Sequence, residues 1–194
     1  MLKVAAIDIA TLNSGQIAFG LAPRINASGR LADASLAVSL LTANDPAEAA
    51  ALAERLDRLN QERQRIVDEM TKEASAMAEA PERRHRDCLV LAKEGWNVGV
   101  IGIVASKILE NECKPAVILS IDPETGICKG SARSIPGFDI HAALTRCDDL
   151  LDHYGGHQAA AGMTMHRDNL AELEERLDRL AKERLAPDDF QPVL

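Results

Sequence analysis

The chain has 194 residues, enough to bury a hydrophobic core as one domain or as one domain with an extension. Its formal net charge of −8 argues against long-range attraction to nucleic acid, so any contact with phosphate would have to be local. The sequence has no secretory signal and no run of about 18 apolar residues, and its four cysteines fit neither a zinc motif nor a dense disulfide framework. We therefore expect a cytoplasmic protein with reduced, buried thiols that does not span a membrane.

The first 30 residues are expected to form a short helix and turn followed by a loop. The loop is the segment 20–30, GLAPRINASGR, in which two glycines and a proline oppose a regular helix interior. Most such segments are solvated turns. This one gathers Arg24, Asn26 and Arg30 around small residues, which ordinary turns seldom do.

Residues 33–81 lack glycine and predict two helices. Asp33 can cap a short helix, and Asp45 can cap a second one with Pro46 at its first position. Nothing interrupts the second helix before residue 81, so it would reach roughly 50 Å. Its apolar seam is Leu52, Leu56, Leu59, Ile66, Met70 and Met77. Charged seam positions disfavour a coiled coil. We interpret the helix as a spacer between two domains, which would leave Leu56 or Ile66 exposed or covered by a second copy of the chain.

Beyond residue 81, short apolar strands alternate with helices. Strands are expected at 88–92, 115–121, 127–133 and 159–166, and helices at 98–112, 140–153 and 168–185. This order predicts an α/β fold with a mixed β-sheet flanked by helices. The expected domains are a helical connector at 1–81, an α/β domain at 82–185 and a linker at 186–194 toward a segment beyond the chain.

Two clusters of small residues flank the expected helix at 140–153. They are the segments 130–134, GSARS, and 155–162, GGHQAAAG. Small residues let backbone amides approach a phosphate, and arginine offers a fork of donors for its oxygens. Ser131 and Arg133 are two residues apart, so on a strand their side chains would converge on one face. The second cluster is expected to end the helix. The simpler alternatives are two ordinary residues of a strand end and a structural histidine, His157, at the helix end.

The second cluster resembles the GGH-x-x-A-A-G signature of the DHHA1 domain, which accompanies DHH phosphoesterase domains. The segment 23–34, PRINASGRLADA, is similar to the R-x-N-A-x-G-R-x-x-D-A segment of RecJ-type single-strand-specific DNA exonucleases, where it connects the DHH and DHHA1 domains. The resemblance continues to the C-terminal end and covers nearly the whole chain. It implies a DHHA1 domain preceded by a helical connector, with the DHH domain missing upstream.

The resemblance also implies roles for individual residues. Ser131 and Arg133 would hold the 5′ end of a DNA strand, and His157 would contact a phosphate near the scissile bond in a supporting catalytic role. The substrate-binding set is completed by Arg24, Asn26 and Arg30, which would line the path of the nucleic acid, and by Gly130, Gly155 and Gly156. The family usually has Trp-His where this chain has Trp96 and Asn97, so no charge is expected there.

A metal site within the chain is not expected. His153 and His157 with nearby aspartates could form a cluster, but the glycines would separate the histidines, and the aspartates fit a solvated helix face. The resemblance agrees, because the manganese or magnesium ligands of the family belong to the DHH domain. The sequence has no Asp-His-His tripeptide.

By resemblance, the parent protein is a metal-dependent 5′-to-3′ exonuclease that degrades single-stranded DNA in DNA repair and recombination, with two metal ions stabilising the attacking and leaving oxygens. This chain would bind DNA and would be inactive alone. The alternatives are a non-catalytic nucleic-acid-binding module and a DHH–DHHA1 phosphodiesterase acting on short oligoribonucleotides or cyclic dinucleotides. A synthetase editing module is more remote, because its zinc-binding His/Cys pattern is missing.

Overall fold

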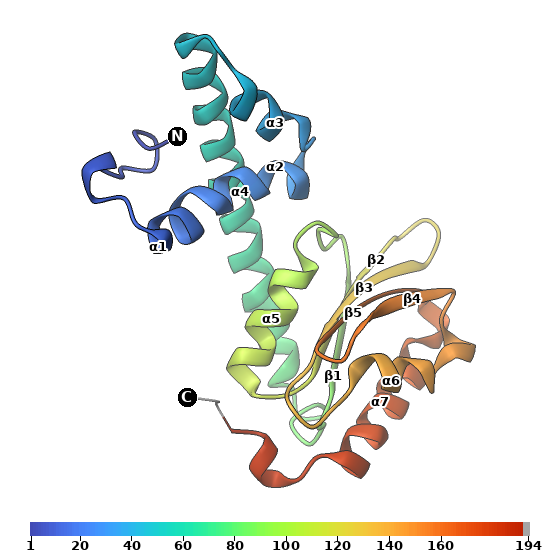
Figure 1. Cartoon of the computed structure of the whole chain (residues 1–194). Coiled ribbons are helices and arrows are strands. Elements are labelled where there is room, and N and C mark those ends of the chain that lie inside the picture. The colour runs from blue at the N-terminus through green and yellow to red at the C-terminus, as the bar shows by residue number, and fades with distance from the viewer. Residues whose placement is uncertain (192–194) are drawn as a thin grey trace. The chain divides into compact units, whose positions relative to one another are not determined.

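A computed structural model describes residues 1–191 of the chain, which divide into two compact units with the boundary between Ile66 and Val67 (Figure 1). Each unit is described by itself. The predicted domain boundaries at residues 81 and 185 stay predictions. No helix among residues 1–191 is both long enough and apolar enough to cross a membrane.

The first unit is helical. A 3₁₀ turn at Ile9–Thr11 is followed by α1 (Ser14–Gln16), a π-helical turn (Ile17–Leu21), α2 (Ala22–Leu31) and α3 (Ser35–Thr42). The predicted short helix after Asp33 is confirmed, and the carboxylate of Asp33 accepts a hydrogen bond from the backbone of Ser35 at 2.8 Å.

The predicted loop at 20–30 is wrong, because most of this segment forms helix α2. Residues 14–31 are helical throughout, with the π-helical turn between α1 and α2. Gly20 lies in this π-helical turn, Pro23 follows it in the first turn of α2, and Gly29 lies near the C-terminal end of α2. Proline removes a backbone donor, and a π-helical turn changes the regular α-helical hydrogen bonding. The residues that oppose a regular helix therefore change its hydrogen bonding locally and do not end it.

Helix α4 (Pro46–Ala78) confirms the predicted long helix and its start. The carboxylate of Asp45 accepts a hydrogen bond from the backbone N–H of Glu48 at 3.1 Å. The buried side of α4 includes Leu56, which is fully buried, whereas Ile66 is half-buried. The prediction named Leu56 or Ile66 as the exposed residue, and the burial of Leu56 rules out the first of the two. The spacer role stays a prediction.

The second unit is a five-stranded sheet in the order β1-β2-β3-β5-β4. The strands are β1 (Leu89–Glu94), β2 (Ala116–Ile121), β3 (Ile127–Arg133), β4 (His153–His157) and β5 (Ala160–His166). Strands β1 and β2 are parallel and the other pairs are antiparallel, so the predicted mixed sheet is confirmed.

Helices cover both faces of this sheet. Helix α5 (Ile101–Glu112) packs over β2 and β3, whereas α6 (Ile140–Thr145) and α7 (Leu170–Arg184) lie on the opposite face (Figure 1). The main core lies under α6 and α7 and includes Val117, Ala132, Met163 and Leu177. The cysteines are all free, and burial raises the pKa of the Cys88, Cys128 and Cys147 thiols.

Strand β4 was not predicted, and the expected helix at 140–153 is wrong beyond Thr145. The helix starts where Asp139 accepts a hydrogen bond from the backbone of Ala142 at 2.9 Å, and a 3₁₀ turn at Asp148–Leu150 follows it. The glycines at 155 and 156 do not end a helix. They lie in an extended strand that pairs with β5.

The linker predicted at 186–194 stays a prediction. A 3₁₀ turn forms at Pro187–Asp189, and Phe190 packs against the core. The last three residues of the expected linker at 186–194 lie outside the described residues.

Asp178 of α7 forms the most buried ionic cluster in the second unit. Its side chain is 4% exposed and accepts hydrogen bonds from Lys182 at 2.7 Å, from the backbone of Asp87 at 2.7 Å and from Arg86 at 3.0 Å. Burial raises the pKa of this carboxyl group, but the three donors together hold it below its ordinary value. The ionised carboxylate therefore ties α7 to the start of β1.

We predict that Asp178→Ala lowers the free energy of unfolding by about 3–5 kcal/mol, because it leaves Arg86 without its buried partner and a backbone N–H unpaired. The matched control is Glu175→Ala, which removes the other carboxylate on Arg86. That group is 63% exposed, so solvent screens its charge and its loss should cost clearly less than the loss of Asp178. Urea unfolding of the chain measures both, and equal losses would contradict the prediction.

The ionic cluster around Asp178 also leads us to predict how stability depends on pH. The folded-state pKa of Asp178 is depressed, so its stabilisation is complete above the unfolded pKa of about 3.9 and is lost as pH falls through the folded value. The stability difference between the native chain and Asp178→Ala should therefore shrink below about pH 4.

Candidate nucleic-acid interface

The register of β3, β5 and β4 brings most of the predicted residues to one face of the sheet. Directly paired residues of antiparallel strands point to the same side. The pairs form two rows: Ser131–Gly162–Gly155, and Arg133–Ala160–His157. Gly155 and His157 are exposed, and Ser131 and Arg133 are half-buried. The predicted convergence of Ser131 and Arg133 thus extends to two residues that lie more than 20 positions away in the sequence.

Ser131 and Arg133 are held together at the β3 end of these rows. Nη1 of Arg133 donates hydrogen bonds to Oγ of Ser131 at 3.1 Å and to the carbonyl of Ala132 at 2.8 Å. This arrangement orients the guanidinium beside the hydroxyl. Both groups can donate to the same phosphate, and a guanidinium suits paired phosphate oxygens.

The N-terminal end of α5 lies close to this pair. A Cβ atom added to Gly102 would stand 3.1 Å from both Nη2 of Arg133 and Oγ of Ser131. The absence of a side chain therefore lets the first turn of α5 approach the two donors. The N-terminus of a helix carries a partial positive charge, which adds to that of Arg133.

Asn97, which was excluded from the predicted site, holds the loop before α5. Its Oδ1 accepts a hydrogen bond from the backbone of Gly99 at 2.9 Å, and its carbonyl accepts one from Val100 at 3.1 Å. Next to it, Nε1 of Trp96 donates to Glu73 at 2.8 Å. The signal in the sequence was an asparagine two residues before a glycine, a pattern typical of a side-chain turn.

His157 lies at the β4 end of its row, two strand spacings from Arg133. Two spacings correspond to about 10 Å between the backbones. A phosphate held closely by Arg133 and one contacted by His157 would therefore be different phosphates of one strand. His157 lies in β4 and is not a helix cap.

The three predicted glycines do not serve one purpose. A Cβ atom at Gly155 would meet no atom within 4 Å, so this position is open. A Cβ at Gly130 would stand 2.8 Å from Met163, and one at Gly156 would stand 2.4 Å from the carbonyl oxygen of Ala160. Gly130 therefore permits packing on the core side, and Gly156 lets β4 approach the backbone of β5 closely. Gly155 keeps the candidate interface accessible.

The three polar residues of the 20–30 segment belong to the first unit. Arg24 is half-buried, with Nε donating to Asp57 at 2.7 Å and Nη1 to the carbonyl of Gly20 at 2.6 Å. Asn26 and Arg30 are exposed and four residues apart in α2, so they share one side of the helix. The structure thus separates Arg24, which supports the fold, from Asn26 and Arg30.

The acidic residues and histidines near β4 do not fit a metal ion. His153 and His157 lie four residues apart on one strand, which separates them by about 13 Å. The carboxylate of Asp149 binds Arg176 at 2.7 Å, which lowers its pKa. Among residues 1–191, no three His, Cys, Asp or Glu side chains gather in a way that could hold a metal ion.

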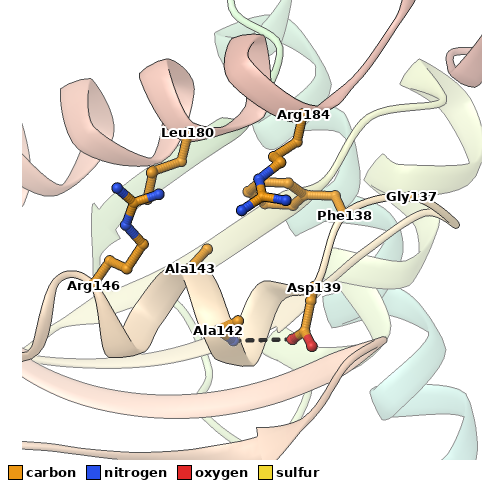
Figure 2. Close-up of a pocket in the computed structure, with 8 residues that line it drawn as sticks. All are labelled: Gly137, Phe138, Asp139, Ala142, Ala143, Arg146, Leu180 and Arg184. Atoms are coloured by element: carbon orange, nitrogen blue, oxygen red, sulfur yellow. Dashed lines mark hydrogen bonds between the residues drawn. The ribbon is translucent and has the colours of Figure 1, made fainter.

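A small pocket lies on the opposite face, between α6 and α7 (Figure 2). Its volume is about 170 Å³, and it is lined by Phe138, Leu180, Arg146 and Arg184 among others. Asp139 at its edge is turned toward the backbone of Ala142, which it caps (Figure 2). Since it lies across the sheet from Ser131 and Arg133, the pocket is separate from the candidate interface.

The neighbouring glycines allow a paired test. We predict that Gly156→Ala destabilises the chain by about 2–3 kcal/mol, because φ is +150° and the added methyl group would collide with the backbone of β5. Gly155→Ala should leave stability within about 0.5 kcal/mol, since its methyl group enters open space. Gly155→Ala should instead weaken phosphate binding. Thermal unfolding and phosphate titration separate the two effects, and a similar loss of stability in both variants would count against this geometry.

The chain is similar in sequence to known proteins. The DHHA1 domain family matches residues 86–183. The single-stranded-DNA-specific exonuclease RecJ of Bacillus subtilis is 46% identical over 100% of this chain and 24% of its own length, and that of Escherichia coli is 39% identical over 98% of this chain and 34% of its own. The chain thus spans about a quarter to a third of the length of these relatives.

Solved structures are similar in fold. A crystal structure of RecJ from Thermus thermophilus in complex with Mg²⁺ matches 94% of this chain and 27% of its own at 34% identity, with a TM-score of 0.83. A crystal structure of exonuclease RecJ bound to manganese matches 99% of this chain and 46% of its own at 35% identity, also with a TM-score of 0.83. The chain therefore belongs to the DHHA1 domain family.

Proposed function

We propose that this chain is the DHHA1 part of a RecJ-type exonuclease, which degrades single-stranded DNA in the 5′-to-3′ direction during repair and recombination in the cytoplasm. The observation that carries the proposal is the similarity to RecJ exonucleases along the entire chain, both in sequence and in fold. The role of the chain is to bind the DNA strand, with Ser131 and Arg133 at its 5′-terminal phosphate and His157 at another phosphate.

The metal ions of such an enzyme have no fitting site among residues 1–191, as described above. The titles of the similar structures name Mg²⁺ and manganese. We infer that manganese or magnesium acts in a DHH domain of the parent enzyme. This chain contributes phosphate contacts and no hydrolytic group of its own.

The surface of the first unit supports the need for a further domain. Several large hydrophobic side chains are exposed there, of which Phe19 at 86% is the most exposed, with Ile9, Ile17, Val38 and Leu41. Exposed large hydrophobic side chains are typical of residues that pack against another protein surface when they lie together. We propose that these side chains contact the DHH domain.

The alternatives have less support. The relatives described above are RecJ exonucleases, not phosphodiesterases of short oligoribonucleotides or cyclic dinucleotides. A non-catalytic nucleic-acid-binding module remains a fair description of the isolated chain, because binding groups are present and fitting metal ligands are not found among residues 1–191.

The first test is activity of the chain alone. We predict no hydrolysis of single-stranded DNA with manganese or magnesium, because the ligand set is missing. Purified chain is incubated with labelled single-stranded DNA, and His157→Ala protein prepared in the same way reveals contaminating nuclease. Cleavage that depends on metal and disappears in the variant would place catalysis in this chain.

The second test is recognition of the 5′ end. In the exonuclease that contains this chain, Arg133→Ala should weaken binding about tenfold to a hundredfold, since a hydrogen bond to a charged group contributes roughly 1.5–3 kcal/mol. The loss should be larger for 5′-phosphorylated DNA than for 5′-hydroxyl DNA. Arg133→Lys should restore only part of the affinity, because it lacks the planar fork.

Arg30→Ala is the control for a contact with internal phosphates, and it should weaken binding of both DNAs alike. Arg24→Ala is less suitable, because it also removes the ion pair with Asp57. Affinity and cleavage rate are measured on both DNAs. Equal losses on the two DNAs in Arg133→Ala would make Arg133 a general phosphate contact.

A further inference from the structure

A second hollow lies next to Ser131 on the same face of the sheet. It lies between the turn joining β2 to β3 and the loop before α5, and its volume is about 420 Å³. Ile127 and Lys129 of β3 line it, and they precede Ser131 at two-residue steps. Residues two apart on a strand share a face, so Ile127 and Lys129 lie on the same face of β3 as Ser131 and Arg133.

The hollow has the apolar character that the phosphate site lacks. Val98 and Ile127, which both line it, are 48% and 39% exposed. Among residues 67–191, they are the only exposed large hydrophobic side chains. Pro123 and Gly95 also line the hollow. Two exposed apolar side chains around one concave site favour an apolar, flat ligand group.

The charges at the edge of the hollow favour an anion on the side of Ser131. Lys129 is exposed and forms no ion pair with a carboxylate among residues 1–191. Asp122 also lines the hollow, but its carboxylate accepts hydrogen bonds from the backbones of Glu124 at 2.9 Å and Thr125 at 3.1 Å. These donors lower the pKa of Asp122 and engage its charge at the turn.

We propose that this hollow receives the nucleobase of the 5′-terminal nucleotide, with Lys129 beside the phosphate that Ser131 and Arg133 hold. From Ser131 to Ile127 the strand covers about 13 Å, a span that one nucleotide can bridge from its phosphate to the far edge of its base. No aromatic side chain lines the hollow. The base therefore packs against aliphatic side chains, which hold purines and pyrimidines without strong preference. This inference rests on the proposed function.

The test is a methyl and backbone NMR titration of the chain with three probes: inorganic phosphate, 2-deoxyribose 5-phosphate and 2′-deoxyadenosine 5′-monophosphate. All three should shift Ser131 and Arg133. Only the nucleotide should shift the methyl groups of Val98 and Ile127 through its ring current. It should bind about fivefold to tenfold more tightly than the sugar phosphate, because the base buries apolar surface.

The variants Val98→Ser and Ile127→Thr should each lower the affinity advantage of the nucleotide over the sugar phosphate to about twofold or less, since they remove part of the apolar lining. Val38→Ser changes an exposed apolar residue of the first unit, so the affinity advantage of the nucleotide should stay unchanged in this control variant. Lys129→Gln should weaken the binding of all three probes, because each of them carries a phosphate.

Two negative results are distinguishable. If the probes shift Ser131 and Arg133 but the nucleotide adds nothing at Val98 and Ile127, the base site is overturned and the phosphate site stands. If none of the probes shifts Ser131 and Arg133, the phosphate site of the proposed function fails, and the base site that depends on it fails too.

Discussion

The pleat of strand β3 is the constraint on which the candidate interface depends. Its even-numbered residues, such as Cys128 and Ala132, are buried in the core under α6 and α7. Its odd-numbered residues, from Ile127 to Arg133, lie on the opposite face. Because the core fixes the even positions, the odd positions cannot rotate, and a slip of one residue would exchange the two sets. Packing on one face therefore fixes the chemistry of the other.

Helix α5 covers only part of the sheet face that carries Ser131 and Arg133, and this leaves the candidate interface accessible. Helix α5 packs over β2 and β3 but leaves Gly155 and His157 exposed on β4. Where α5 does reach the site, Gly102 allows it to lie against Ser131 and Arg133. One helix thus excludes solvent from part of the sheet, contributes its N-terminal end and leaves the rest of the face open.

Local arrangement also reconciles a net charge of −8 with the proposed binding of DNA. Several carboxylates are engaged by basic groups within the chain, as with Asp178 and Arg86, or Asp149 and Arg176. The donors of the candidate site instead converge on one end of β3, together with the N-terminal end of α5. At physiological salt, charges beyond about 8 Å are largely screened, so the local arrangement outweighs the net charge for a bound phosphate.

The sequence alone determined the α/β class, the long helix from Pro46, three strands of the sheet nearly to the residue, and the pairing of Ser131 with Arg133. These features depend on local periodicity, on caps such as Asp45 and on two-residue alternation. Only the tertiary structure decided that segment 20–30 is helical, that Gly155 and Gly156 form a strand, and that Arg24 pairs with Asp57. Asp57 lies 33 residues from Arg24, so no local pattern joins them. Strand β4 is close in sequence to β5 and forms a hairpin with it, but β5 also pairs with β3, where Gly162 lies opposite Ser131. A glycine pair reads as a helix end until this sheet supplies the edge on which it becomes a strand, and no local pattern contains that pairing.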